Sequence, residues 1–232
     1  MLKESAATWG IFLTGLQIQQ LERYAAELRH WNEYYNLVAD ASQQEVIVRH
    51  FLDSLRCAAS WGSTPQKLVD IGSGAGFPGL PLKIAFPHIQ LTLVESVEKK
   101  SAFLKHIVET LALENVAVIT TRAELFAHMP EHREHYDVAL ARAVAELAVL
   151  AEYCLPLLHI GGRLLAPKGA QIADELSNAE VALHLLGGQL HAVEQIILPG
   201  QPERSLIVIE KIALTPERYP RRVGLPARKP LS

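Results

Sequence analysis

The feature that most constrains this chain is a glycine-rich turn at residues 70–79, with the sequence DIGSGAGFPG. A short apolar run at residues 67–69 precedes the turn, and a helix-forming stretch at residues 80–86 follows it. Glycine takes positive φ angles and lets a ligand approach the backbone, and the start of the helix offers unpaired N–H groups. Glu95 ends the next apolar run, residues 90–94, where a carboxylate can accept hydrogen bonds from ribose hydroxyls. The pattern therefore predicts a strand, a turn and a helix that bind a nucleoside cofactor.

Beyond residue 66, segments typical of strands alternate with segments typical of helices. We expect strands at residues 67–71, 90–95, 116–120, 137–141, 162–166, 192–197 and 205–210. Between them we expect helices near residues 80–86, 99–111, 145–158 and 172–186. This alternation predicts an α/β fold with a mostly parallel sheet that is covered on both faces. The connection at residues 199–202 is too short for a parallel crossover, so it predicts a C-terminal antiparallel hairpin. Seven strands in this arrangement resemble the class I (Rossmann-like) methyltransferase fold.

We expect the chain to divide into three parts. Residues 1–62 are predicted to form a helical N-terminal extension, because apolar side chains recur there at helical spacing, at about residues 17–38 and 43–59. Residues 63–212 are predicted to form the cofactor-binding domain, and residues 213–232 a tail that packs on or beside it. The tail carries five cations and one anion, whereas the whole chain has a net charge of −3. A polyanion such as RNA would therefore be contacted locally rather than over the whole surface.

Composition also limits the cellular setting. No run is long and apolar enough to span a membrane, and the first residues lack the pattern of a signal peptide. Cys57 and Cys154 are far apart in the sequence and are expected to be reduced. His128, His132 and His135 lack the further ligands of a metal site, so we predict no metal. We expect a cytoplasmic monomer with no contact to membranes.

The glycine turn also matches the dinucleotide pattern G-x-G-x-x-G, so the choice of cofactor depends on further features. Asp70 lies two residues before the first glycine, where its carboxylate can hold the loop or the amino-acid end of S-adenosylmethionine (AdoMet). Gly72, Gly74 and Gly76 are more tightly spaced than the dinucleotide pattern requires. The terminal hairpin leaves little chain for the separate substrate domain that most dehydrogenases need. These features favour AdoMet over a nicotinamide or flavin cofactor.

Motifs along most of the chain resemble one family. They are the motifs WN (31–32), NL (36–37), HFLDSL (50–55), the glycine turn, LVES (93–96), KK (99–100), ARAVA (141–145), PKG (167–169) and TPERYPRR (215–222), with Gly224 and Pro226. The set resembles the RsmG (GidB) family, whose members methylate N7 of a guanine in 16S ribosomal RNA of the bacterial small subunit. The resemblance implies the same reaction, AdoMet as cofactor, and 16S ribosomal RNA or the small ribosomal subunit as partner.

The resemblance also implies the residues of an AdoMet pocket. At matching positions these are Gly72, Phe77, Glu95, Ser96, Val97, Ala123, Glu124 and Arg142. The glycine turn itself adds Asp70, Gly74 and Gly76. Glu95 can accept both ribose hydroxyls, and Ala123 follows the third strand, where a loop can meet the adenine. For Glu124 a backbone contact, a side-chain contact and a solvated surface position all stay open.

Arg142 follows the fourth expected strand, at the sheet edge where substrates bind. Enzymes that methylate exocyclic amines resemble one another in an Asn/Asp-Pro-Pro-aromatic motif at this place, which residues 141–144 lack. Guanine N7 already has a lone pair in the base plane, so its methylation needs alignment rather than a general base. We expect Arg142 to hold O6, a nearby phosphate or the cofactor, and an ion pair with Glu146 is the alternative. Arg142→Ala should then reduce turnover strongly, with a modest loss of stability.

Three further basic residues are candidates for contacts with RNA. Lys168 follows the fifth strand at the same edge, where a solvated lysine is the alternative. Arg221 and Arg222 lie in the tail, which salt bridges could instead strap to the protein.

His50 and Asp53 share one face of a helix, so they could close over the cleft or bond each other on the helix surface.

Two other functions are compatible with the same fold. A small-molecule methyltransferase would not need a cationic tail, and a non-catalytic AdoMet-binding regulator would transfer no methyl group. Motifs at both ends of the chain favour the RNA methyltransferase.

Trp9 and Phe12 are expected in the core rather than in a surface that stacks bases.

Overall fold

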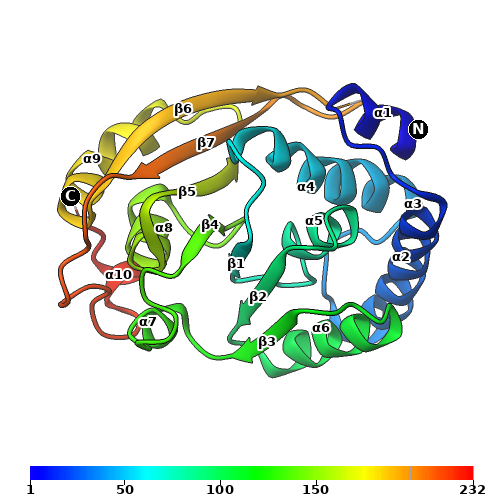
Figure 1. Cartoon of the computed structure of the whole chain (residues 1–232), viewed down its shortest axis with the longest axis horizontal. Coiled ribbons are helices and arrows are strands. Elements are labelled where there is room, and N and C mark those ends of the chain that lie inside the picture. The colour runs from blue at the N-terminus through cyan, green and yellow to red at the C-terminus, as the bar shows by residue number, and fades with distance from the viewer. Residues whose placement is uncertain (199, 232) are drawn as a thin grey trace.

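The computed structural model of the chain describes residues 1–198 and 200–231. It contains a seven-stranded sheet in the order β3-β2-β1-β4-β5-β7-β6 (Figure 1). The strands are β1 (Lys67–Ile71), β2 (Gln90–Glu95), β3 (Val116–Thr120), β4 (Tyr136–Leu140), β5 (Leu158–Lys168), β6 (Gly188–Ile196) and β7 (Arg204–Lys211). The first five strands pair in parallel, and β7 lies antiparallel between β5 and β6. The predicted sheet, mostly parallel with a C-terminal antiparallel hairpin, is confirmed.

Two strands, β5 and β6, begin well before their predicted starts, and β4 and β7 begin one residue early. β5 starts at Leu158 rather than at residue 162, because the pairing with β4 continues across an irregularity in register between Tyr136 and Val138. Gly161 takes a φ of 88° at this irregularity, a conformation that glycine permits. β6 starts at Gly188 rather than at residue 192, opposite the end of β7. The predicted hairpin connection at 199–202 includes Pro199, which lies outside the described residues.

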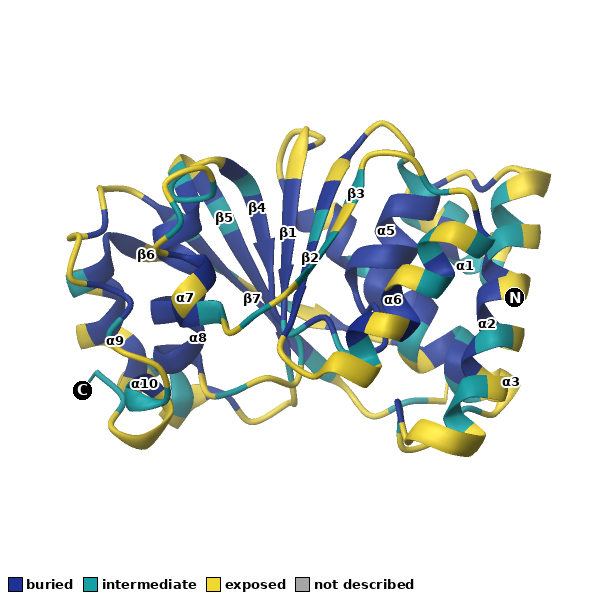
Figure 2. Ribbon diagram, turned by 90° about the horizontal axis from the view of Figure 1, so that it is seen from below, coloured by how far each residue is buried: buried dark blue, intermediate teal, exposed yellow. Residues whose placement is uncertain are grey.

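Helices cover both faces of the sheet. They are α1 (Leu2–Thr8), α2 (Gly15–Tyr35), α3 (Gln43–Glu45), α4 (Asp53–Arg56), α5 (Gly79–Ala85), α6 (Glu98–Thr110), α7 (Ala123–Phe126), α8 (Leu147–Cys154), α9 (Ala173–Leu186) and α10 (Leu225–Arg228). A π-helical segment (Val46–Leu52) joins α3 to α4, and 3₁₀ segments follow α4 (Cys57–Ser60) and α8 (Leu155–Leu157). Figure 2 shows α1, α2, α5 and α6 on one side of the strands, and α8, α9 and α10 on the other.

The side chains of the strands alternate between two buried clusters, one on each face of the sheet. Leu68 and Leu140 belong to the cluster that includes α2, α5 and α6. Val69 and Ala139, their chain neighbours, belong to the cluster under α8 and α9. Burial on both faces is typical of a parallel sheet with crossover helices. It also leaves the carboxyl ends of the strands as the place where polar groups can gather.

The N-terminal extension braces the glycine turn. The helix α2 begins in a capping box between Thr14 and Gln17. From the middle of this helix, the fully buried Tyr24 donates a hydrogen bond to the carbonyl oxygen of Ala75. The Tyr24 ring also stacks on the Phe77 ring, with 5.4 Å between their centroids. The extension therefore packs against the same core as the sheet and supports one wall of the turn.

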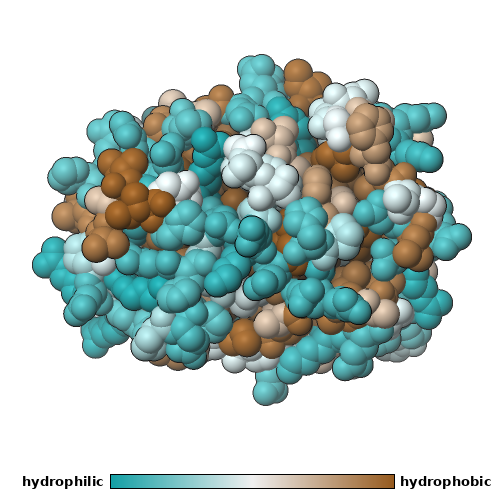
Figure 3. All heavy atoms as spheres, in the orientation of Figure 1, coloured by the Kyte–Doolittle hydropathy of each residue, from teal (hydrophilic) through white to brown (hydrophobic). Residues whose placement is uncertain are grey.

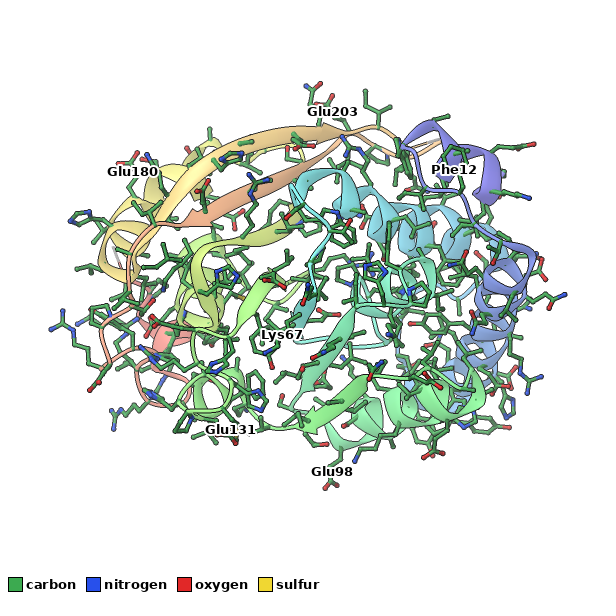
Figure 4. The ribbon with its side chains drawn as sticks, viewed as in Figure 1. Phe12, Lys67, Glu98, Glu131, Glu180 and Glu203 are labelled. Carbon is green, nitrogen blue, oxygen red and sulfur yellow. The ribbon has the colours of Figure 1, made fainter. Side chains whose placement is uncertain are left out.

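The prediction that Phe12 lies in the core is wrong. Phe12 is 80% exposed, whereas its neighbours Ile11 and Leu13 are buried, because successive side chains of this extended connection point in opposite directions. Figure 4 shows Phe12 at the rim of the molecule, far from Lys67 at the start of β1. Trp9 packs partly buried against the core.

The face seen in Figure 1 is mostly hydrophilic, with hydrophobic side chains in separate groups (Figure 3). Within the described residues, no helix combines the length and the apolar character needed to span a bilayer.

Candidate active site

The glycine turn lies where the strand order reverses, between β1 and β4. The backbone N–H groups of Gly72 and Ser73 donate to the carbonyl oxygen of Val94, at 2.8 and 3.2 Å, which fixes the turn against β2. Gly76 takes a φ of 97°, and a Cβ atom there would lie 2.4 Å from Leu80 and 2.6 Å from the Tyr24 hydroxyl. Only glycine fits this position, so the backbone of the turn keeps one fixed shape at the sheet edge.

Glu95 ties the turn to the loop after β2. One carboxylate oxygen accepts from the N–H of Gly74 at 2.9 Å, and the other accepts from the N–H of Val97 at 2.8 Å. The side chain is nearly buried, at the end of β2. Each carboxylate oxygen accepts more than one hydrogen bond, so Glu95 can also receive hydroxyl groups of a ligand.

Asp70 is a buried carboxylate with one oxygen unused. Its Oδ2 accepts from the N–H of Gly79 at 3.0 Å, whereas its Oδ1 is buried and has no hydrogen-bond partner in the described part of the chain. Burial raises the pKa of Asp70 to about 7, against the lowering effect of the Gly79 hydrogen bond and the nearby Arg142. An unpaired buried acceptor is costly, because it has lost its water and gained no donor in return.

Two cavities meet at Gly72. The first, here called the tail cavity, is lined by Gly72, Ser96, Ala123, Glu124 and Ala227, with further apolar residues of β1, β2 and α8. The second, here called the glycine cavity, is lined by Gly72, Gly74, Phe77, His50 and Arg142, with Leu37, Val38, Ala39, Ser73, Ala75, Lys100 and Ala143. An elongated ligand could therefore lie across the turn with one end in each cavity.

The cavities bring together most of the residues predicted for the cofactor. Gly72, Gly74, Phe77, Ser96, Ala123, Glu124 and Arg142 line one cavity or both. Glu95 stands between the cavities through its bond to Gly74. Asp70, Gly76 and Val97 shape the strand end and the loops but line neither cavity. The contacts of all the expected residues with a cofactor stay predictions.

Arg142 is fixed by residues of the N-terminal extension. Its guanidinium donates to Asp53 Oδ2 at 2.9 Å, to the carbonyl oxygen of Arg49 at 3.1 Å, and to His50 Nδ1 at 3.0 Å. Asp53 is fully buried and also lies 3.4 Å from Arg204. The alternative partner, Glu146, is exposed and forms no ion pair with Arg142 in the described residues. Arg142 thus joins the fourth strand to the helices that cover the site.

Sequence reasoning missed that His50 and Asp53 act on Arg142. The helix spacing had placed both on one face, with two uses open. In the structure they do not bond each other but share the same guanidinium. The His50 ring also stacks on Phe77, with 4.5 Å between centroids and 14° between planes. Burial, with help from the cations Arg142, Arg49 and Arg204, lowers the pKa of His50 to about 3, so the ring is neutral.

Lys168 lies at the same edge but is engaged within the protein. Its ammonium donates to the carbonyl oxygen of Ala145 at 2.6 Å and to Glu175 at 2.5 Å. Glu175 in turn accepts from the N–H of Leu147, at the start of α8. Lys168 therefore fixes the segment that carries Arg142, and its contact with RNA stays a prediction.

The tail lies over α7 and α8 and completes the tail cavity. Arg221 forms a bidentate ion pair with Glu152, which is fully buried in α8. The Glu124 carboxylate is buried and accepts from the N–H of Gly224 at 2.8 Å, so a solvated position for Glu124 is excluded. Ala227, in α10, then lines the tail cavity.

His128, one of three histidines considered for a metal, donates instead to the carbonyl oxygen of Pro220 at 2.7 Å.

We expect Arg221→Ala to lower the free energy of unfolding by about 3 kcal/mol or more, because Glu152 would remain buried without its partner. Arg222 is exposed, so Arg222→Ala is a matched control that should change stability by less than about 0.5 kcal/mol. Urea unfolding of both variants measures the difference. Equal stability of the two variants would mean that the ion pair does not anchor the tail.

Comparison with known proteins points to one family. The family described as "GidB: rRNA small subunit methyltransferase G" matches residues 17–207. "Ribosomal RNA small subunit methyltransferase G" of Roseiflexus castenholzii is 58% identical over 226 residues, which are 97% of this chain and 97% of the relative. The protein of the same name from Chloroflexus aggregans is 52% identical over 231 residues, which are 100% of this chain and 97% of the relative.

Solved structures agree on the fold. The O-methyltransferase from Bacillus cereus in complex with SAH has a TM-score of 0.60 at 15% identity, over 83% of this chain and 91% of that chain. TYW2 from M. jannaschii, in complex with AdoMet, has a TM-score of 0.55 at 15% identity, over 74% of this chain and 78% of that chain. At this level of identity the likeness shows the class I methyltransferase fold.

Proposed function

Because the chain belongs to the family of rRNA small subunit methyltransferase G (GidB), we propose that it transfers a methyl group from AdoMet to N7 of a guanine in 16S ribosomal RNA. The observation that carries the proposal is the identity of 58% with a protein of this name over nearly the full length of both chains. Its partner would be 16S ribosomal RNA or the small ribosomal subunit. We propose that the enzyme acts in the cytoplasm as a monomer, with residues 63–212 as the AdoMet-binding domain between the helical extension and the tail.

The residues at the sheet edge fit AdoMet. The unpaired Oδ1 of Asp70 would accept from the ammonium of the methionine part, close to the glycine turn. Glu95 would accept from the ribose hydroxyls, and the tail cavity with Ser96, Ala123 and Glu124 would hold the adenine. When bound, AdoMet supplies an electrophilic methyl group on its sulfonium sulfur.

The protein's part in the reaction is alignment. Guanine N7 needs no deprotonation, and the neutral His50 is a poor candidate for a general base because its pKa is lowered to about 3. Arg142 is held by three hydrogen bonds at the wall of the glycine cavity, and its remaining N–H groups can position the base or the cofactor. Of the basic residues predicted to contact RNA, Arg222 has an exposed side chain with no bond to the described residues, so it is the one most available for a phosphate.

Methyl transfer from labelled AdoMet tests the proposal. The acceptors are small ribosomal subunits and naked 16S RNA from a strain that lacks this protein, and the RNA is digested to nucleosides for mass analysis. We expect label in 7-methylguanosine, and the better acceptor shows the stage of subunit assembly at which the enzyme acts. Label in another nucleoside would refute transfer to N7. Protein that binds AdoMet but labels neither acceptor would favour the small-molecule methyltransferase or the regulator.

A further inference from the structure

A third cavity opens beside the glycine cavity. It is here called the arginine cavity, because Arg49, Arg142 and Arg204 line it together with Asp40 and Glu45. Four residues line both the arginine cavity and the glycine cavity: Ala39, His50, Arg142 and Ala143. The two cavities therefore adjoin at His50 and Arg142. A group that enters through the arginine cavity meets the contents of the glycine cavity at these two side chains.

The polar groups left free at this junction are hydrogen-bond donors. A guanidinium cannot accept, so the bond between Arg142 and His50 Nδ1 shows that Nδ1 carries no proton. The proton of the neutral ring is then on Nε2, which forms no hydrogen bond within the described residues and is not buried. Arg142 has five N–H groups. Its three hydrogen bonds within the protein leave two of these groups free for a ligand.

This junction is complementary to one edge of guanine. Guanine presents two acceptors, N7 and O6, on its major-groove edge, whereas adenine presents the N7 acceptor beside the N6 amino donor. We propose that the arginine cavity receives the target guanine, and that the Nε2–H of His50, together with Arg142, binds O6 and leaves N7 free for the methyl group. His50 is then a specificity-determining residue that selects guanine over adenine. This inference rests on the proposed function, because it concerns the acceptor base of that reaction.

The rest of the arginine cavity suits a nucleotide. Arg49 is largely exposed and Arg204 partly exposed, so both can reach phosphates that flank the base. Asp40 and Glu45 supply carboxylates that can accept from the N1–H and N2–H groups of guanine. The His50 ring is kept in place by stacking on Phe77 and by its bond to Arg142. A fixed donor can discriminate between bases because the wrong base leaves it unpaired.

The role of His50 is tested by measuring the wild-type enzyme and a His50 variant on two acceptor RNAs that differ in the target base. The acceptor RNA carries either guanine or 2-aminopurine at the target position; 2-aminopurine lacks O6 but keeps N7. We expect the wild-type enzyme to lose about 10- to 100-fold in kcat/KM on 2-aminopurine RNA. His50→Asn keeps an acceptor near the position of Nδ1 but removes the Nε2–H. On guanine RNA, the kcat/KM of this variant should be lower than that of the wild-type enzyme by a similar factor. On 2-aminopurine RNA, its kcat/KM should be little lower than that of the wild-type enzyme on the same RNA.

His50→Gln is the matched control, because its side-chain amide can place a donor near the position of Nε2. This variant should keep most of the preference for guanine RNA, and it tests the proposal even if His50→Asn fails to fold. Equal rates of the wild-type enzyme on the two RNAs would overturn the proposal without any variant. The proposal would also be overturned if His50→Asn lowered both rates by the same factor, as expected of a residue that acts only through Arg142. Absence of 7-methylguanosine from wild-type enzyme on guanine RNA would instead overturn the proposed function itself.

Discussion

Arg142→Ala is expected to lower kcat/KM for RNA methylation by about 100-fold or more and to destabilise the folded protein by about 3 kcal/mol or more. The loss of activity follows from the position of Arg142 at the junction of the two cavities. The loss of stability follows from Asp53, which is fully buried and would keep only the longer contact of 3.4 Å with Arg204. The sequence alone had suggested a modest loss of stability, and the buried ion pair revises this expectation upward.

The two effects of this substitution can be separated. Arg142→Met combined with Asp53→Asn removes the arginine and the buried charge together, so it should recover much of the stability but none of the activity. Urea unfolding and single-turnover methylation are measured on each variant. If Arg142→Ala kept wild-type kcat/KM, Arg142 would have no part in the reaction. If Arg142→Ala kept wild-type stability, water or Arg204 would be sufficient to stabilise the buried charge of Asp53.

Asp70→Asn is expected to stabilise the protein without cofactor and to weaken AdoMet binding by about 10-fold or more. The buried Asp70 has a pKa raised to about 7, whereas an unfolded aspartate has a pKa near 4. Between about pH 4 and 7 the folded protein therefore binds a proton that the unfolded chain has released, so this group reduces stability as the pH rises. Above about pH 7 the reduction is complete. The free energy of unfolding of Asp70→Asn should therefore exceed that of the wild-type protein by an amount that grows from pH 4 to 7 and reaches about 2 to 4 kcal/mol.

Urea unfolding at pH 5 and pH 8, with and without AdoMet, measures this effect. Asp137 is the matched control, because hydrogen bonds from Lys67, His159 and Gln66 overcome its burial and lower its pKa. Asp137→Asn should therefore destabilise the protein at pH 8, opposite in sign to Asp70→Asn. An advantage of Asp70→Asn that did not change with pH would show that Asp70 is not a costly buried charge. Unchanged AdoMet affinity would remove Asp70 from the cofactor site.

The sequence predicted the sheet, and the gathering of the candidate side chains at one edge of it, for a simple physical reason. Periodic apolar runs reveal strands, and the ends of parallel strands meet at one edge whatever the details of packing. Asp70 and Glu95 lie in the last residues of such strands and Arg142 follows one, so their convergence could be predicted. The early starts of β5 and β6 could not, because exposed residues and glycines there carry no periodic signal.

The partners of the charged residues were harder to predict. The pairing of Arg142 with Glu146 assumed a helix, but α8 begins only at Leu147, so the rule for residues four apart does not apply. The true partner, Asp53, is 89 residues away in the sequence. For Arg221 the sequence left a contact with RNA and a salt bridge within the protein both open, and the structure pairs it with Glu152. A glutamate within the apolar run of α8 was the available signal, because a charge in such a run needs a partner.

The position of the tail on Glu124 and Glu152 sets an order of events during synthesis of the protein. The ribosome makes the glycine turn, α7 and α8 well before it makes β7, which must insert between β5 and β6, and the tail follows β7. Until residues 221–227 have been made, Glu152 lacks its arginine and the tail cavity lacks the wall that contains Ala227. A chain that terminates early would therefore carry the whole glycine turn and still have an open, unneutralised site. The residues that finish the pocket are made after every strand of the sheet, so the protein becomes competent only once the tail has been made and has docked on α7 and α8.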